Sequence, residues 1–392
     1  MRHTSFQHIG KYGIIVDMKL TAKVKLQPTP DQASSLKRTL EIANTACSHI
    51  SEQAWTHRVF RQLPLHKLAY HDVRERFPLT AQVVVRCISK VADAYKIDRK
   101  TMRTFKPHGA IAFDNRILKW YIDLHEVSIW TVDGRQRIPF VCGKRQEELL
   151  QGQRGESDLV LIHDEFYLLA VCDVETPEPR DVHDVLGCDL GIVNLATDSD
   201  GEHYSGKAIE DNRYKHEHRR KNLQKKQTKS AKRKLKKISG KQARFQSNTN
   251  HTISKRLVQK AQDTERAIAL EDLAGIRNRS RFRRKQRSKF ANWSFYQLRQ
   301  SITYKAMLAG IPVIFVDPRY TSQICPVCGY VSKSNRPNQS TFSCVSCGYS
   351  ANADTTAAIN IARAAVNQPN EHLAQGSALR GSYKLPALAG SS

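Results

Sequence analysis

Three acidic residues that lie far apart in the sequence are the first candidates for chemistry. Asp189 belongs to an otherwise apolar predicted strand (185–189), where an unpaired charge would be costly, so the sequence favours a bound cation, an ion pair or a position at the strand end. Glu271 follows a second predicted strand (267–270), at the end where α/β sheets display functional groups. Asp354 lies in the first turn of a predicted helix, where the helix dipole alone favours an acid. Each acid taken alone is therefore ambiguous.

Together the three acids favour a nuclease. Two-metal hydrolysis of phosphodiesters requires hard carboxylates that converge on two Mg²⁺ about 4 Å apart. One ion lowers the pKa of the attacking water, and the other neutralises charge at the leaving oxygen. We therefore predict that Asp189, Glu271 and Asp354 are catalytic and bind two Mg²⁺, and that the products carry 5′-phosphate and 3′-hydroxyl ends.

Four of the nine cysteines have the spacing of a zinc site. Cys325 and Cys328 form one C-x-x-C pair, Cys344 and Cys347 form a second, and 15 residues separate the pairs. Four thiolates would make a closed, structural Zn²⁺ site with no open position for catalysis. Two disulfides are the alternative, which suits a secreted chain better. The remaining cysteines are predicted to be small buried hydrophobes; they are Cys47, Cys87, Cys142, Cys172 and Cys188.

The chain is strongly basic, and the charge is concentrated. Its 392 residues include 63 Lys and Arg against 37 Asp and Glu, which gives a formal net charge of +26. Residues 213–241 hold 14 Lys and Arg with one acid, and residues 277–289 hold eight with none. This pattern favours a nucleic-acid partner over the alternative of solvated charge runs. The predicted contacts are Arg219, Arg220, Lys225, Lys226, Lys232, Arg233, Lys236, Lys237, Arg281, Arg283, Arg284 and Arg287.

The two basic runs suggest different modes of binding. The first run is predicted to be a helix that neutralises phosphates without reading bases. Near the second run lie Phe282, Phe290 and Trp293, which could stack on unpaired bases or anchor a helix predicted at residues 294–309. The sequence contains no helix-turn-helix or other base-reading motif.

The amino-terminal pattern predicts a small β-barrel interrupted by helices. A strand is predicted at residues 19–26, after which Thr29 begins a helix with a capping box, and a later helix covers residues 80–104. Six further strands are predicted between residues 110 and 171. Much later, residues 311–318 predict a strand covered on both faces.

Composition excludes several classes of protein. With 40% hydrophobic residues, the chain has too much apolar material for wholesale disorder, and no apolar run approaches the ~18 residues of a membrane span. We expect a soluble, cytoplasmic protein of two or three domains, without a signal peptide or a membrane partner.

Several longer motifs follow one another in a recognisable order. They are VKLQPTPDQ (24–32), GCDLGIVNLAT (187–197), ALEDLAGIRNR (269–279), NWSFYQLRQ (292–300) and the stretch from DPRYTSQICPVCGY to CVSCGYSANADTTAAINIA (317–362). In combination they resemble the TnpB family, RNA-guided nucleases of bacterial and archaeal insertion sequences that are similar to type V CRISPR effectors. The resemblance covers residues 19–365. Thr356 departs from it, since the family commonly has Asn there, and we expect altered efficiency rather than inactivity.

The resemblance implies a multidomain α+β fold. A RuvC-like nuclease domain of RNase H-like fold would carry an inserted zinc ribbon, and an N-terminal β-barrel wedge would carry a helical recognition insertion. The implied boundaries are 1–17 for an N-terminal extension, 18–28 and 106–178 for the wedge, 29–105 for the insertion, 179–319 and 350–366 for the nuclease domain, 320–349 for the ribbon and 367–392 for a flexible tail.

The resemblance also implies a function and partners. The protein would be an RNA-guided DNA endonuclease encoded by a transposable element, with Asp189, Glu271 and Asp354 at its catalytic positions. Its partners would be a guide RNA from the element end and a double-stranded DNA target, and it would act as a monomer with its RNA, associated with the nucleoid.

Two other functions remain open. A nuclease-silent, RNA-guided DNA-binding regulator would retain target DNA in the presence of Mg²⁺ and leave it uncut. A strand-transferring transposase, or an accessory DNA-binding protein of transposition, is the other alternative. The sequence contains no His-hydrophobe-His motif with a partnering Tyr to join DNA strands.

Overall fold

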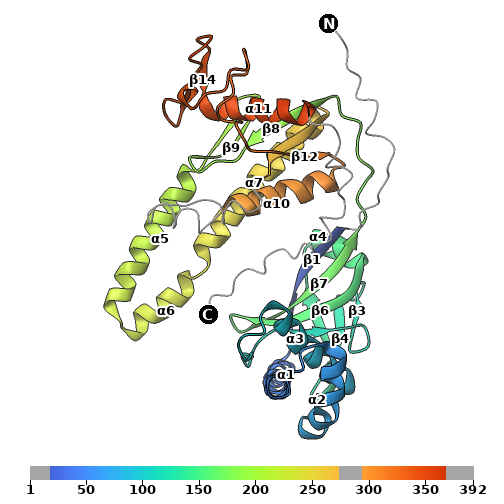
Figure 1. Cartoon of the computed structure of the whole chain (residues 1–392). Coiled ribbons are helices and arrows are strands. Elements are labelled where there is room, and N and C mark those ends of the chain that lie inside the picture. Colours follow the sequence, from blue (N-terminus) through green and yellow to red (C-terminus); the bar gives the residue numbers. More distant parts are fainter. Residues whose placement is uncertain (1–17, 273–293, 368–392) are drawn as a thin grey trace. The chain divides into compact units, whose positions relative to one another are not determined.

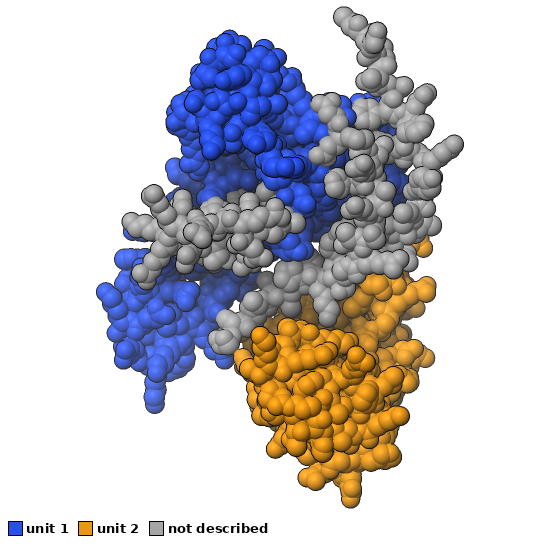
Figure 2. All heavy atoms as spheres, in the orientation of Figure 1, with its two compact units in different colours: residues 1–16, 176–381, 388–392 blue, residues 17–175, 382–387 orange. Residues whose placement is uncertain are grey.

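The computed structural model of the protein describes residues 18–272 and 294–367. Within these ranges the chain separates into two compact units, one formed by residues 18–175 and the other by residues from 176 onward (Figures 1 and 2). No helix of the described residues is both long and apolar enough to cross a membrane. The predicted extension, the predicted tail and the second basic run lie outside the described residues.

The first unit contains a seven-stranded antiparallel sheet in the order β2-β6-β7-β1-β5-β4-β3. Strand β1 joins the two halves of the sheet, because it pairs with β7 over most of its length and with β5 at its carboxyl end. Trp120 Nε1 donates a hydrogen bond to Ser157 Oγ (3.3 Å) and so links strands near opposite edges, which fits the predicted barrel. The predicted strands are confirmed as β1 (Met18–Leu26), β2 (Ile111–Phe113), β3 (Leu118–Tyr121), β4 (Glu126–Thr131), β5 (Gly134–Val141), β6 (Gln153–Ile162) and β7 (Glu165–Val174).

The first unit contains four helices, α1 (Pro30–Thr56), α2 (Gln62–Arg76), α3 (Ala81–Ile97) and α4 (Lys144–Gln151). The sequence predicted the starts of α1 and α3, whereas it predicted neither α2 nor α4. The capping box at Thr29 is confirmed, since its side chain accepts from the backbone of Gln32 and its backbone donates to the Gln32 side chain. The prediction that α3 continues to residue 104 is wrong. Asp98 takes an extended conformation and its carboxylate accepts hydrogen bonds from Lys100 and Thr101, which ends the helix.

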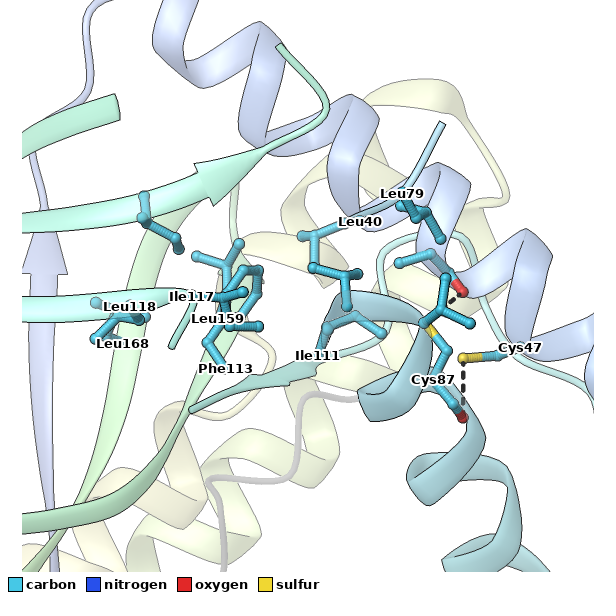
Figure 3. Packing of buried hydrophobic residues seen from close by; sticks show 14 of the residues in the cluster. Leu40, Cys47, Leu79, Cys87, Ile111, Phe113, Ile117, Leu118, Leu159 and Leu168 are labelled. Atoms are coloured by element: carbon cyan, nitrogen blue, oxygen red, sulfur yellow. Dashed lines mark hydrogen bonds between the residues drawn. The ribbon is translucent and has the colours of Figure 1, made fainter. Parts of the chain in front are cut away.

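The core of the first unit packs helix faces against the sheet. Figure 3 shows Leu40 and Cys47 of α1 and Cys87 of α3 in one buried cluster with sheet residues such as Phe113. The predicted burial is confirmed for Cys47 and Cys87, and also for Cys172 and Cys188, but Cys142 is only partly buried because it lies just beyond the end of β5.

The second unit contains a five-stranded mixed sheet in the order β10-β9-β8-β11-β12. Strand β9 runs antiparallel to its neighbours β10 and β8, whereas β8, β11 and β12 are parallel. The strands are β8 (Asp184–Asp189), β9 (Asn194–Asp198), β10 (His203–Ser205), β11 (Arg266–Glu271) and β12 (Val313–Val316). The helices are α5 (Lys207–Lys226), α6 (Lys229–Ile238), α7 (Lys241–Asp263), α10 (Ser294–Leu308) and α11 (Ala353–Asn367).

Helices cover both faces of this sheet. Helices α7 and α10 contribute Leu257 and Leu298 to an apolar cluster on one face, and α11 contributes Ile361 to a cluster on the other. The two faces of β12 pack against different clusters, as predicted, although β12 is an edge strand and most of its residues are therefore only partly buried.

The first basic run is not one helix, as predicted, but three. It covers most of α5, all of α6 and the first residue of α7. Gln227 adopts a left-handed backbone conformation (φ 49°), and Thr228 then caps α6 by accepting a hydrogen bond from the backbone of Ala231 (3.1 Å). Gly240 (φ 74°) provides the second break, because glycine takes this conformation without strain.

Candidate active site

Asp189 and Glu271 end two neighbouring strands of the second unit. Strands β8 and β11 are parallel, with Cys188 paired to Leu270, so the next residue on each strand is one of the two acids. Parallel strands end at the same edge of a sheet, which places both carboxylates there. The strand predictions for both acids are confirmed.

Helix α11 brings Asp354 to the same region. The helix packs directly on β8 at Gly187, where a Cβ atom would lie 2.0 Å from the carbonyl oxygen of Ala358 and 2.7 Å from the backbone nitrogen of Ala362. Only glycine permits so close an approach. Asp354 lies four residues before Ala358, hence on the same face of α11 and one turn nearer its amino end. Asn352 fixes that first turn by accepting a hydrogen bond from the Asp354 backbone (2.9 Å).

The three carboxylates influence one another. Burial, followed by the negative charges of Glu271 and Asp354, raises the pKa of Asp189 to about 7, and Arg336 partly opposes this effect. Burial also raises the pKa of Glu271, while a hydrogen bond from Thr321 lowers it. Such a group of partly buried acids is a destabilising arrangement that a cation would relieve, and oxygen ligands of this kind suit Mg²⁺.

Three side chains that the sequence did not single out hold these acids in place. Thr321 Oγ1 donates to Glu271 Oε1 (2.6 Å), and Asn194 Nδ2 donates to Asp354 Oδ2 (2.9 Å). Arg336 donates to the other oxygen of Asp354 (3.3 Å). Asn194 and Thr321 lie inside the motifs quoted above, and this position was the signal that could have identified them as partners of the acids. Arg336 lies between the two cysteine pairs, where no motif pointed to it.

Two nearby residues have no direct part in this group. Asp272 is exposed and forms an ion pair with Arg299 (3.0 Å). Thr356 is fully buried, and its hydroxyl donates to the carbonyl of Asn352, the residue just before α11 (2.9 Å). Its side chain is therefore turned toward the backbone at the start of the helix.

The four ribbon cysteines form a compact cluster of sulfur atoms. All four Sγ atoms lie within 4.8 Å of one another, and among the described residues this is the one group of three or more potential metal ligands so close together. The pairs Cys325–Cys347 and Cys328–Cys344 are each 3.6 Å apart, too far for a disulfide. The backbone N–H of Cys347 contributes most to lowering the pKa of Cys344 to about 6, which favours the thiolate. The cluster can hold a metal such as zinc.

A glycine closes each of the two turns of the ribbon. Gly329 and Gly348, which follow the two cysteine pairs, have positive φ angles of 75° and 76°. Their backbone N–H groups donate to the carbonyls of Cys325 (2.9 Å) and Cys344 (3.0 Å), which closes each turn. A small hairpin of β13 (Thr341–Ser343) and β14 (Ser350–Asn352) then leads into α11.

Helix α11 is tied to the chain that enters the ribbon. The buried side chain of Asn360 donates to the carbonyls of Thr321 and Ile324, at 2.8 Å each. Arg363 donates to the carbonyl of Pro326, between the first two cysteines. Since Thr321 also holds Glu271, the ribbon, α11 and two of the acids form one connected structure.

The structure places the described basic candidates on the surface. All eight are exposed along α5 and α6: Arg219, Arg220, Lys225, Lys226, Lys232, Arg233, Lys236 and Lys237. The other four candidates, at positions 281, 283, 284 and 287, lie outside the described residues, as do the aromatic residues near them.

Two family models match the chain. Residues 169–291 match the model described as "Probable transposase", and residues 295–361 match the model "Cas12f1-like, TNB domain". A CRISPR-associated endodeoxyribonuclease Cas12f1 from Sulfoacidibacillus thermotolerans is 37% identical over 240 residues, 55% of each protein. TnpB-like protein MJ0751 from Methanocaldococcus jannaschii is 30% identical over 150 residues, 38% of this chain and 53% of that protein. The matches span 55% or less of the curated relatives' own lengths.

Solved structures share the fold at low sequence identity. The protein in the cryo-EM structure of a Cas12f1-sgRNA-target DNA complex has a TM-score of 0.54 and 15% identity, and the match covers 84% of this chain and 81% of that chain. The mini-RNA-guided endonuclease CRISPR-Cas_phi3 has a TM-score of 0.56 and 12% identity, over 91% of this chain and 94% of that chain. This multidomain α+β chain thus carries matches to both family models and is similar to TnpB-like proteins and to the Cas12f1 proteins.

Proposed function

We propose that the protein is an RNA-guided DNA endonuclease encoded by a transposable element, in which Asp189, Glu271 and Asp354 support hydrolysis of DNA phosphodiesters. The observation that carries the proposal is the grouping of three mutually repelling carboxylates at one edge of the second sheet. A purely structural site would gain nothing from this repulsion. Strongly perturbed acids of this kind are typical of catalytic sites.

The order of the sheet supports a nuclease domain of RuvC type. Three antiparallel strands followed by two parallel ones, in the order β10-β9-β8-β11-β12, are typical of RNase H-like domains. We assign residues 179–319 and 350–366 to this domain and 320–349 to its zinc ribbon. In the other unit, residues 18–28 and 106–178 would form the wedge and residues 29–105 the recognition insertion.

The residues present fit divalent magnesium, because every candidate ligand is a carboxylate oxygen. When bound, two Mg²⁺ ions supply activation of the attacking water and neutralisation of the leaving oxygen. The chain itself fixes the acids: Thr321 orients Glu271, and Asn194 and Arg336 hold the two oxygens of Asp354. The four ribbon cysteines would hold Zn²⁺, which keeps α11 in position.

The partners proposed for this chain are a guide RNA and a double-stranded DNA target. The S. thermotolerans relative is named as a DNA nuclease, and one structural neighbour is a protein in complex with sgRNA and target DNA. The exposed lysines and arginines of α5 and α6 support binding to phosphate backbones. With no base-reading motif in the sequence, a guide RNA is the natural source of sequence specificity.

The proposal can be tested with the protein and RNA from its native locus. We would purify the protein with its co-expressed RNA, sequence that RNA, and supply a plasmid library that matches the 3′ end of the RNA beside randomised flanks, with Mg²⁺. Depletion of one flank that is abolished by Asp354→Ala would support guided cleavage. Target DNA that is bound but left uncut would contradict it and favour a regulator.

A further inference from the structure

Helix α5 buries none of its 20 residues, although it runs beside α7 in the same unit (Figure 1). Apart from Ile209, which packs against the apolar core at the start of the helix, α5 gains little from packing, so the rest of its inner face is available to a ligand. Between α5 and α7 there is an open cavity of about 660 Å³. Its lining includes Asp211, Asn212, Lys215, His216 and Arg219 of α5 and Phe245 of α7.

The α5 side of the cavity presents positive charge. The lining residues of α5 recur every three or four positions, so they form one continuous face of the helix. Lys215 and Arg219 are exposed and lie four residues apart, on successive turns of this face. Among the described residues, neither of them forms an ion pair or a hydrogen bond. Both cations are therefore available to a ligand.

The opposite side of the cavity supplies an aromatic ring. Phe245 remains 38% exposed at the start of α7 although it is a large apolar side chain. A ring for stacking and two neighbouring cations match the base face and the phosphates of a nucleotide.

We infer that the cavity between α5 and α7 binds one unpaired nucleotide of a nucleic-acid strand. The base stacks on Phe245, and the adjoining phosphates contact Lys215 and Arg219. The inference rests on the proposed function insofar as the strand belongs to the guide RNA or the target DNA. It adds a contact to a base on a surface that otherwise neutralises only phosphates.

The test measures the affinity of the full-length chain for single-stranded decamers, in EDTA so that no cleavage occurs. The probes are an adenine RNA decamer, the matching DNA decamer and an abasic decamer with the same number of phosphates. We expect Phe245→Ala to weaken binding of the adenine decamers about tenfold and to leave the abasic decamer unaffected, because only a base can stack. Phe245→Tyr should retain the wild-type affinity.

Tyr214→Ala is the matched control. Tyr214 is an aromatic residue on α5 that is 70% exposed and does not line the cavity, so its removal should leave all three affinities unchanged. Lys215→Ala should weaken the binding of the adenine decamers and of the abasic decamer alike. A stronger effect of Phe245→Ala on RNA would identify the guide as the source of the nucleotide, and a stronger effect on DNA would identify the target strand.

Two results would overturn the inference: equal effects of Phe245→Ala on base-containing and abasic decamers, or no effect on either. Circular dichroism would show that the variant is folded. If the chain cuts guided DNA but shows either of these results, only the inference that the cavity binds a nucleotide is overturned. A chain that binds decamers through Phe245 but cuts no DNA would overturn the proposed function alone.

Discussion

At the scale of single residues, the three acids combine a cost in stability with a capacity for chemistry. Asp189 is surrounded by low-polarity protein and by the charges of Glu271 and Asp354, so its ionised form is disfavoured. The cost of burying like charges close together is commonly offset by a bound ion or by stability elsewhere in the fold. The first predictions follow from this electrostatic arrangement.

We expect Asp189→Asn to raise the free energy of unfolding of the metal-free protein at pH 8. The pKa of Asp189 rises from 3.8 to about 7 on folding, so stability falls as pH increases between these values and the full penalty persists above pH 7. Removal of the charge should recover on the order of 2 kcal/mol. Urea unfolding in EDTA measures this, and a loss of stability in the variant would contradict it.

Protons should compete with Mg²⁺ at the same carboxylate. At subsaturating Mg²⁺, we expect the cleavage rate to rise with pH through about 7, because Asp189 must lose its proton to bind a cation. Higher Mg²⁺ concentrations should move the midpoint to lower pH. Rates measured at several Mg²⁺ concentrations test this, and a midpoint independent of Mg²⁺ would rule out direct competition.

At the scale of elements, the contact between α11 and β8 determines where Asp354 lies. Gly187→Ala would place a methyl carbon 2.0 Å from the Ala358 carbonyl, so helix and strand must separate. We expect a loss of about 2 kcal/mol or more in the free energy of unfolding, together with a large loss of cleavage.

Gly143→Ala, at the start of α4, serves as the control for this variant. A Cβ atom there meets only the flexible end of the Gln146 side chain, at 3.0 Å. This variant should unfold and cut like the wild type. Cleavage that survives Gly187→Ala at full rate would show that the position of α11 does not matter.

The zinc ribbon should affect catalysis through the same helix. Asn360 and Arg363 connect α11 to residues beside Cys325, so Cys344→Ser should lower both the zinc content and the cleavage rate. Metal analysis of the purified protein should find one zinc per wild-type chain. Cys142→Ser, in the other unit, should change neither quantity, and full cleavage by a zinc-free protein would contradict this coupling.

The sequence predicted the presence of helices and strands better than it predicted where they end or which side chains connect them. Period-two alternation and a local capping box predicted β1 and α1, because those signals lie within the elements themselves. The end of α3 depends on hydrogen bonds of the Asp98 side chain, which periodicity does not reveal. The support of Asp354 by Arg336 joins residues in different elements, and only the folded chain shows it.

At the scale of the whole molecule, charge and chemistry are concentrated in the same unit. The carboxylates, the cysteine cluster and the exposed basic helices α5 and α6 all belong to residues from 176 onward. The other described unit has its own sheet and a separate apolar core. This division is consistent with a nuclease unit and a second unit that we assign to RNA and target recognition.

The grouped acids are proposed to cut DNA, and a neighbouring acid outside the group allows a sharp test of that role. Glu271 and Asp272 are adjacent in sequence, but Glu271 is bound by Thr321 whereas Asp272 is exposed and pairs with Arg299. We would measure single-turnover cleavage of a guided target with Mg²⁺ by Glu271→Gln and Asp272→Asn. We predict a loss of about 10³-fold or more for the first variant and near wild-type cleavage for the second. Equal rates for the two variants would contradict a catalytic role for the grouped acids.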